Sequence, residues 1–164
     1  MISKSTIIIL FVAIVFGVIF WYSGGSRISD EMPYYLKQVV KNTATVKIHD
    51  ATYHMEIAQT PAAREKGLSN RSFLDPDKGM IFVFPTSGIY PFTMANTLIS
   101  LDIIWIKDNT IVFMAQRAQP HQVDIIPTVE ANYVLELNGG KTEGTGIAVG
   151  DTVDIIFDSE VNPR

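Results

Sequence analysis

The chain contains no cysteine, which excludes disulfides, zinc-thiolate sites, thiol catalysis and a lipid-modified cysteine anchor. It also has no run of basic residues, and its net charge is −4. Nucleic-acid binding needs a basic face, and attraction to anionic lipid headgroups needs a polybasic segment. We therefore expect no nucleic-acid partner, and any attachment to a membrane has to come from apolar residues.

Recognisable catalytic and cofactor motifs are absent as well. The chain has no Gly-x-Ser-x-Gly elbow. The glycine-rich residues 138–146 lack the Walker spacing of a phosphate loop, so they predict a β turn and connection. His54 beside Met55 is compatible with a copper(I) site, although methionine is more often a core residue. We predict no metal and no cofactor, and whether the protein is an enzyme stays open.

An uncharged apolar run lies between Ile7 and Tyr22, with Lys4 before it. Its length lies between the apolar region of a signal peptide, about 7–15 residues, and a transmembrane helix of about 20. Trp21 and Tyr22 close the run, as interfacial aromatic residues do. The pattern predicts a single-pass signal anchor in the cytoplasmic membrane, with the N-terminus inside and the rest outside. The alternative is signal cleavage near residues 23–26, which would give a secreted or periplasmic protein.

Three regions follow from this pattern. Residues 1–26 form the predicted signal anchor and linker. Residues 27–42 form a juxtamembrane segment, in which Pro33 suits the first turn of a short helix. Residues 43–164 form the predicted β domain.

Alternation of apolar and polar residues dominates the β domain. With the Gly, Pro, Asn and Asp residues between the runs, it predicts a mainly-β sandwich or barrel of about eight short strands. One short helix interrupts them, with Thr60 as N-cap, Pro61 at the first helical position and Gly67 as its end. The clearest predicted strands are residues 45–49, 53–58, 79–84, 102–107, 111–117, 132–138 and 151–157.

The order of local motifs resembles an uncharacterised family, domain of unknown function 192. The resemblance covers roughly residues 46–157 and implies a mostly-β domain with a short helix, often behind a signal peptide or membrane anchor. It implies no established activity. The motifs are Thr60-Pro61, Arg64, Gly67-Leu68, Asn70-Arg71, 79–84, Phe92, Met94, Asn96-Thr97, 101–103, 133–137, Gly140 and Gly150-Asp151.

Two departures from the family pattern bear on function. The family usually has Phe-Trp-Met-Lys-Asn-Thr at residues 92–97, where this chain has Thr93 and Ala95 in place of the aromatic and the cation. If this stretch is extended, positions 93, 95 and 97 share one face, which has lost a stacking surface and a charge. In addition, Ser69 stands where family members commonly carry methionine.

A polar cluster at a pocket mouth is one interpretation of the embedded polar residues, and the candidate ligand-binding residues are Arg64, Arg71, Asn96, Thr97, Asp102 and Glu136. The alternative is structural. Asn96 and Thr97 would then shape a bend, and Asp102 would cap a turn or pair with one of the arginines. Glu136, on the opposite face of its strand from Leu135, would face solvent or a cation.

We expect a membrane-tethered extracytoplasmic β domain that acts as a non-enzymatic binding or accessory module. Its partners would be the membrane, through the run from Ile7 to Tyr22, and a cell-envelope component or a membrane protein. The alternative is a hydrolase-like enzyme that uses Asp102 and Glu136 as paired carboxylates, with Arg64 or Arg71 orienting an anionic substrate.

Overall fold

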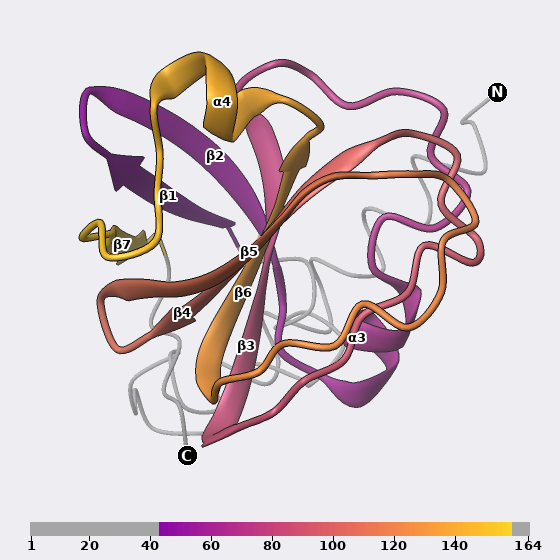
Figure 1. Ribbon diagram of the computed structural model, residues 1–164, viewed down its shortest axis with the longest axis horizontal. Coiled ribbons are helices and arrows are strands. Elements are labelled where there is room, and N and C mark those ends of the chain that lie inside the picture. The colour runs from indigo at the N-terminus through magenta and orange to yellow at the C-terminus, as the bar shows by residue number, and fades with distance from the viewer. Residues whose placement is uncertain (1–42, 159–164) are drawn as a thin grey trace, which may run out of the picture. The chain divides into compact units, whose positions relative to one another are not determined.

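The computed structural model describes residues 43–158, which form seven strands and two short helices (Figure 1). The strands are β1 (Thr43–Ile48), β2 (Ala51–Ala58), β3 (Lys78–Gly88), β4 (Leu101–Lys107), β5 (Thr110–Ala118), β6 (Ala131–Asn138) and β7 (Asp154–Phe157). The helices are α3 (Pro61–Lys66) and α4 (Lys141–Thr145). The mainly-β prediction is confirmed. The predicted anchor and juxtamembrane helix lie outside the described residues, within which no helix is long and apolar enough to cross a membrane.

All seven strands belong to one sheet, in the order β5-β4-β6-β3-β2-β1-β7. Only β2 and β3 run parallel, and the connection between them carries α3. The segment before β7 returns to the start of β5. There Ile111 N–H donates to Asp151 O at 2.9 Å, and Val153 N–H donates to Asn109 O at 2.8 Å. These bonds bring the two ends of the sheet together, so the domain is a barrel rather than a sandwich.

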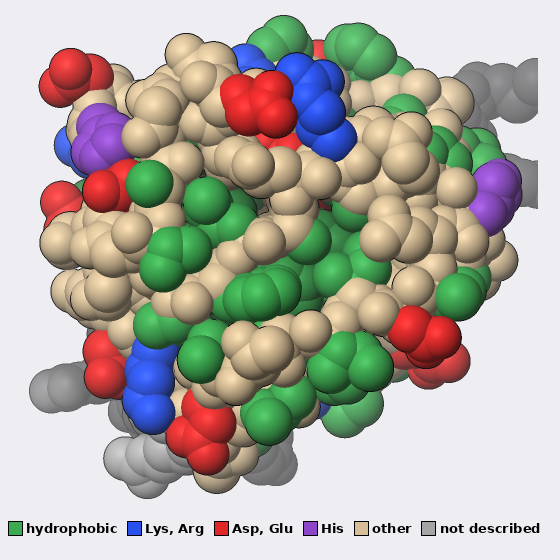
Figure 2. Space-filling view, viewed as in Figure 1, with side chains coloured by type: hydrophobic (Ala, Val, Ile, Leu, Met, Phe, Trp, Pro, Cys, Tyr) green, Lys and Arg blue, Asp and Glu red, His purple; other side chains and the backbone are tan. Residues whose placement is uncertain are grey.

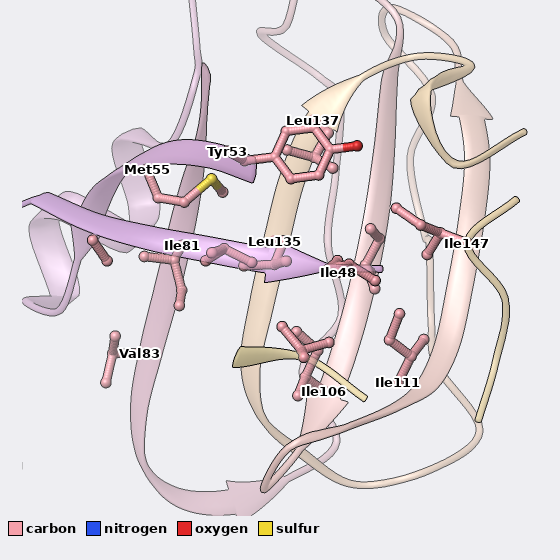
Figure 3. Close-up of a cluster of buried hydrophobic side chains, with 14 residues drawn as sticks. Ile48, Tyr53, Met55, Ile81, Val83, Ile106, Ile111, Leu135, Leu137 and Ile147 are labelled. Atoms are coloured by element: carbon pink, nitrogen blue, oxygen red, sulfur yellow. The ribbon is translucent and has the colours of Figure 1, made fainter. Parts of the chain in front are cut away.

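The inner face of the sheet encloses an apolar core, shown in Figure 3. Alternate residues of each strand point inward, as the period of two requires. Val46, Ile81 and Leu135 are each fully buried there. Because apolar side chains from every strand meet in this core, its burial stabilises the barrel as a single unit.

The outer face of the central strands is covered too. A second cluster includes Phe82 of β3, Trp105 of β4 and Val134 of β6, with Leu68 and Met94 from the segments that lie over them. The central strands are therefore buried on both faces, which explains why their sequences are almost continuously apolar. Other hydrophobic side chains stay on the surface, and Figure 2 shows them across the face in view.

The two helices differ in how well the sequence predicts them. In α3, Thr60 Oγ1 accepts a hydrogen bond from Ala63 N–H at 3.2 Å, and Gly67 ends the helix at φ 47°, as predicted. In α4 the prediction of a β turn is wrong. The N-cap of α4 is Gly140, which has no side chain, and a carboxylate from another strand caps this helix instead.

Candidate functional site

Asp102 is that carboxylate, and it is fully buried. Its Oδ1 accepts from the N–H groups of Arg117 at 2.8 Å and Gly140 at 2.9 Å. Its Oδ2 accepts from the N–H and from the hydroxyl of Thr142, both at 2.8 Å. The predicted capping role is therefore confirmed, whereas an ion pair with Arg64 or Arg71 is not formed. With four donors already on its two oxygens, Asp102 has little capacity left for a ligand.

The paired-carboxylate hypothesis is contradicted by strand register. Asp102 lies opposite Leu137, whose side chain is in the inner core. Glu136 lies opposite Ile103, whose side chain is in the outer cluster. The two carboxyls therefore point to opposite faces of the sheet, and they cannot act together on one bond.

Glu136 is buried, with 5% of its surface exposed, so it does not face solvent, and the cation acting on it is Arg71, with which it forms no ion pair. It shares the outer face with Val134, as alternation predicts. Its Oε2 atom has no hydrogen-bond partner among the described residues. Loss of water raises the pKa of Glu136 to about 8, although the nearby charge of Arg71 acts in the opposite direction. Around neutral pH, Glu136 is therefore mostly an uncharged acid.

A cavity of about 300 Å³ lies between α3, the outer face of the sheet and residues 90–97, and we call it the α3 cavity. The buried carboxyl of Glu136 is part of its lining, together with Phe82 from the neighbouring strand. The full lining is Arg64, Glu65, Lys66, Gly67, Leu68, Ser69, Phe82, Phe84, Tyr90, Pro91, Phe92, Thr93, Thr97 and Glu136. The cavity therefore combines an apolar wall with an unpartnered polar group, as ligand sites do.

Arg64 lines this cavity and also holds its wall in place. Its Nη1 donates to the carbonyl oxygen of Gln59 at 2.6 Å and to that of Val83 at 3.0 Å. Its guanidinium lies 5.1 Å from the ring centroid of Phe84, which stacks on Tyr90 at 3.6 Å. Arg64 thereby fixes α3 to the residue after β2 and to the middle of β3.

Arg71 lies in a neighbouring cavity of about 450 Å³, which we call the Arg71 cavity. It forms two hydrogen bonds of 2.6 Å with the carboxylate of Glu56. This pairing lowers the pKa of Glu56 and raises that of Arg71. Glu56 was not among the residues predicted for a site, although alternation places it on the face opposite Met55. Glu56 pairs with Met80 of β3, and Met80 pairs with Glu136 of β6. Both acids therefore lie on the outer face of the sheet.

Asn96 and Thr97 lie in a turn closed by a 3.0 Å bond from Thr97 N–H to Met94 O. The predicted bend is confirmed, so the condition under which positions 93, 95 and 97 would share one face is not met. Thr97 is buried and lines the α3 cavity with Thr93, whereas Asn96 is exposed. Because of this turn, Ala95 does not line the cavity, although Thr93 and Thr97 on either side of it do.

His54 and Met55 do not form a metal pair. Met55 is fully buried in the inner core, whereas His54 is exposed on the opposite face of β2. Adjacent residues of a strand point to opposite sides, so the two side chains cannot bind the same ion.

Comparison with known proteins identifies the family. The model of the family described as DUF192, Uncharacterized ACR, matches residues 43–155. The chain belongs to the DUF192 family. The match covers almost all of the described barrel, including α3 and both cavities. No curated protein is significantly similar to this DUF192 chain.

Two crystal structures share its fold. One is a candidate transcription regulator from Sinorhizobium meliloti 1021, with 31% identity and a TM-score of 0.64, and the match covers 69% of this chain and 92% of that one. The other is a protein of unknown function from Novosphingobium aromaticivorans DSM 12444, with 34% identity and a TM-score of 0.63, covering 68% and 83%. Neither description defines a ligand for the α3 cavity.

Proposed function

We propose that this DUF192 protein is a membrane-tethered, extracytoplasmic module that binds a segment of a cell-envelope polymer in the α3 cavity without catalysing a reaction. The observation that carries the proposal is the buried Glu136 in the lining of that cavity, whose Oε2 atom has no hydrogen-bond partner among residues 43–158. A buried polar group without a partner destabilises the fold by about 1–3 kcal/mol. A ligand that hydrogen-bonds to Glu136 would remove this penalty, so binding would be favoured.

The arrangement of the two cavities favours a chain-like ligand. The α3 cavity and the Arg71 cavity share Lys66 and Gly67 in their linings. Glu56 in one and Glu136 in the other are two strands apart, which corresponds to about 10 Å between their Cα atoms. Consecutive units of a polymer could therefore occupy the two cavities.

Tethering is supported by the apolar run between Ile7 and Tyr22, which suits a signal anchor. The Sinorhizobium relative is described as a candidate transcription regulator. We do not propose DNA binding for this chain because its acidic residues outnumber its basic ones. The hydrolase alternative has no support, since its two carboxyls lie on opposite faces of the sheet.

The test is co-sedimentation of the full-length protein, in mild detergent, with cell-wall sacculi and with isolated envelope polysaccharide. We expect the wild-type protein to sediment with one of these polymers. The Glu136→Leu variant should bind at least about tenfold more weakly, because it lacks the polar group. Glu130→Gln is the matched control, since Glu130 is an exposed acid that pairs with Lys107.

Two results would contradict the proposed function. One is the absence of sedimentation with any envelope polymer. The other is equal binding by the wild-type and Glu136→Leu proteins. Recovery of a membrane protein instead, by pull-down from the native membrane, would favour the alternative of an accessory subunit.

A further inference from the structure

Resting on the proposed function, we infer that the unit held in the α3 cavity is an uncharged sugar ring, which packs one face on the partly exposed rings of Tyr90 and Phe92 and hydrogen-bonds through its hydroxyls. The aromatic side chains that line the cavity are Phe82, Phe84, Tyr90 and Phe92. The lining also contains the hydroxyl residues Ser69, Thr93 and Thr97. A sugar ring has the same two properties, because its C–H faces are apolar and its edge carries hydroxyl groups.

The charges around the cavity oppose a cationic ligand. Arg64 and Lys66 already line it, and an amine would lie beside both. The ring of Phe84 could attract a cation, but the guanidinium of Arg64 lies over that ring and Tyr90 stacks on it. An amine would therefore find both faces of the Phe84 ring occupied, and it would be repelled by the positive charges of Arg64 and Lys66.

An anionic ligand is disfavoured for different reasons. The Nη1 atom of Arg64 is engaged with two backbone carbonyls, so this cation is already used in holding the wall. Glu136 and Glu65 are part of the same lining. A negatively charged ligand would lose water beside the buried Glu136 carboxyl, and it would compete with Glu65 for the charge of Lys66.

A wholly apolar ligand is disfavoured as well, because it would leave Glu136 Oε2 without a partner. The protonated carboxyl can donate one hydrogen bond and accept others. A hydroxyl group also does both, so the two can pair in either direction. The buried acid therefore selects a ligand that is neutral but rich in hydroxyl groups.

A peptide fits the floor of the cavity less well than a sugar. Peptides commonly bind by adding a strand to an open sheet edge. Phe82 is on β3 and Glu136 is on β6, and both strands are paired on both sides within the sheet. Their backbone groups are therefore engaged in the sheet, and the floor offers only side chains to a ligand.

The test compares four probes: tetramers of β-1,4-linked glucose, glucosamine and glucuronic acid, and a neutral tetrapeptide. Trp105 reports on the cavity, because its Nε1 donates to Tyr90 O at 2.9 Å and its ring contacts Phe92 edge to face. In the full-length protein, Trp21→Phe leaves Trp105 as the single tryptophan, and its fluorescence is excited selectively at about 295 nm or above. We expect the glucose tetramer to bind at least tenfold more tightly than the other three. Glu136→Leu should weaken that binding at least tenfold, and Glu130→Gln should leave it unchanged.

The inference is overturned if the amine, the acid or the peptide binds as tightly as the neutral sugar, or if none of the four binds. Neither result contradicts the proposed function, which is tested separately by co-sedimentation with envelope polymers. If an envelope polymer is retained while the glucose tetramer is not preferred, the protein is a binding module with a different ligand chemistry. If the Glu136→Leu variant does not fold, Thr97→Val tests the same cavity instead. This substitution removes one hydroxyl from the lining and should weaken binding of the glucose tetramer severalfold.

Discussion

At the scale of single residues, the chain contains two buried carboxyls with opposite environments. Asp102 accepts four hydrogen bonds and joins β4, β5 and α4. Glu136 is just as well buried, yet its Oε2 atom has no partner in the described part of the chain. The first arrangement stabilises the fold, and the second leaves hydrogen-bonding capacity unused. This contrast is why we assign Asp102 to structure and Glu136 to binding.

The raised pKa of Glu136 predicts how stability depends on pH. The folded state keeps the proton up to a pKa of about 8, whereas the unfolded chain releases it near the ordinary glutamate pKa of 4.5. The free energy of unfolding should therefore fall as the pH rises through this interval. Glu136→Gln keeps a neutral side chain, so at pH 9 it should be more stable than the wild type by on the order of a few kcal/mol, with no such gain at pH 4. Urea unfolding at both pH values measures this.

The control for this experiment is Glu56→Gln. The pKa of Glu56 is lowered, chiefly by its hydrogen bonds with Arg71, so its stabilisation is present above the unfolded pKa and is lost as the pH falls. About half of its side chain is exposed, so the effect should be at most about 1 kcal/mol. An identical pH dependence for the wild type and Glu136→Gln would show that Glu136 is ionised in the folded protein. Arg64, Glu65 and Lys66, which line the same cavity, would then be the groups to examine.

Asp102 predicts a different result. Asp102→Ala leaves the donors of Arg117, Gly140 and Thr142 buried without their acceptor, so it should lower the free energy of unfolding by about 3–5 kcal/mol. Thr142→Val removes only one of these donors, together with the acceptor for Gln116, and should cost about 1–2 kcal/mol. Urea unfolding of both variants measures the difference. A loss below 1 kcal/mol for Asp102→Ala would contradict this account.

At the scale of elements, close approach of strands decides the position of Glu136. Gly79 of β3 lies opposite Leu137 of β6, and it has no Cβ to separate the two strands. A Cβ on Gly79 would collide with the carbonyl oxygen of Glu136 and would lie 2.8 Å from Leu137 Cδ2. A glycine here therefore lets the β3–β6 pair form at the register that brings Glu136 under α3.

Two glycine substitutions test this reasoning. Gly79→Ala should destabilise the protein by about 3 kcal/mol, because backbone and core atoms obstruct the new methyl group. Gly144→Ala is the matched control: Gly144 lies in α4 with nothing within 4 Å of its missing Cβ, so the change should be neutral or stabilise by about 0.5–1 kcal/mol. Thermal unfolding of the two variants compares them, and equal effects would contradict the close-approach argument.

At the scale of the whole molecule, the open question is the side of the membrane on which the barrel lies. Because the chain has no cysteine, Ser72→Cys introduces a unique thiol at an exposed position of the barrel. A membrane-impermeant maleimide should label it in intact spheroplasts. Ser3→Cys, before the apolar run, should be labelled only after lysis. Labelling of Ser72→Cys that also requires lysis would place the barrel in the cytoplasm and contradict the proposed tether.

The mass of the mature protein separates the two predicted forms of export. An intact N-terminus would support the signal anchor. Loss of the residues before a site near 23–26 would support cleavage, and the barrel would then be released from the membrane.

Much of the architecture follows from the sequence alone. Apolar patterning placed strands in all seven regions, by alternation in some and by a continuous apolar run at residues 79–84, because each strand has at least one face against a core. Thr60, Pro61 and Gly67 predicted α3, since capping and chain termination depend on residues that are close in sequence. Alternation also placed Glu136 on the face opposite Leu135. These features rest on local chemistry, and local chemistry can be read from neighbouring residues.

Only the tertiary structure decided what those faces contact. Glu136 is buried because α3 and residues 90–97 lie over the outer face of the sheet, and no local pattern states that they do. Asp102 caps α4 because strand pairing brings together donors from β5 and from residues 140–142. Burial and hydrogen-bond satisfaction depend on segments that are distant along the chain. The sequence by itself therefore determined a mainly-β domain, whereas the folded arrangement determined that its sheet closes into a barrel and which of its acids is left with an unused hydrogen bond.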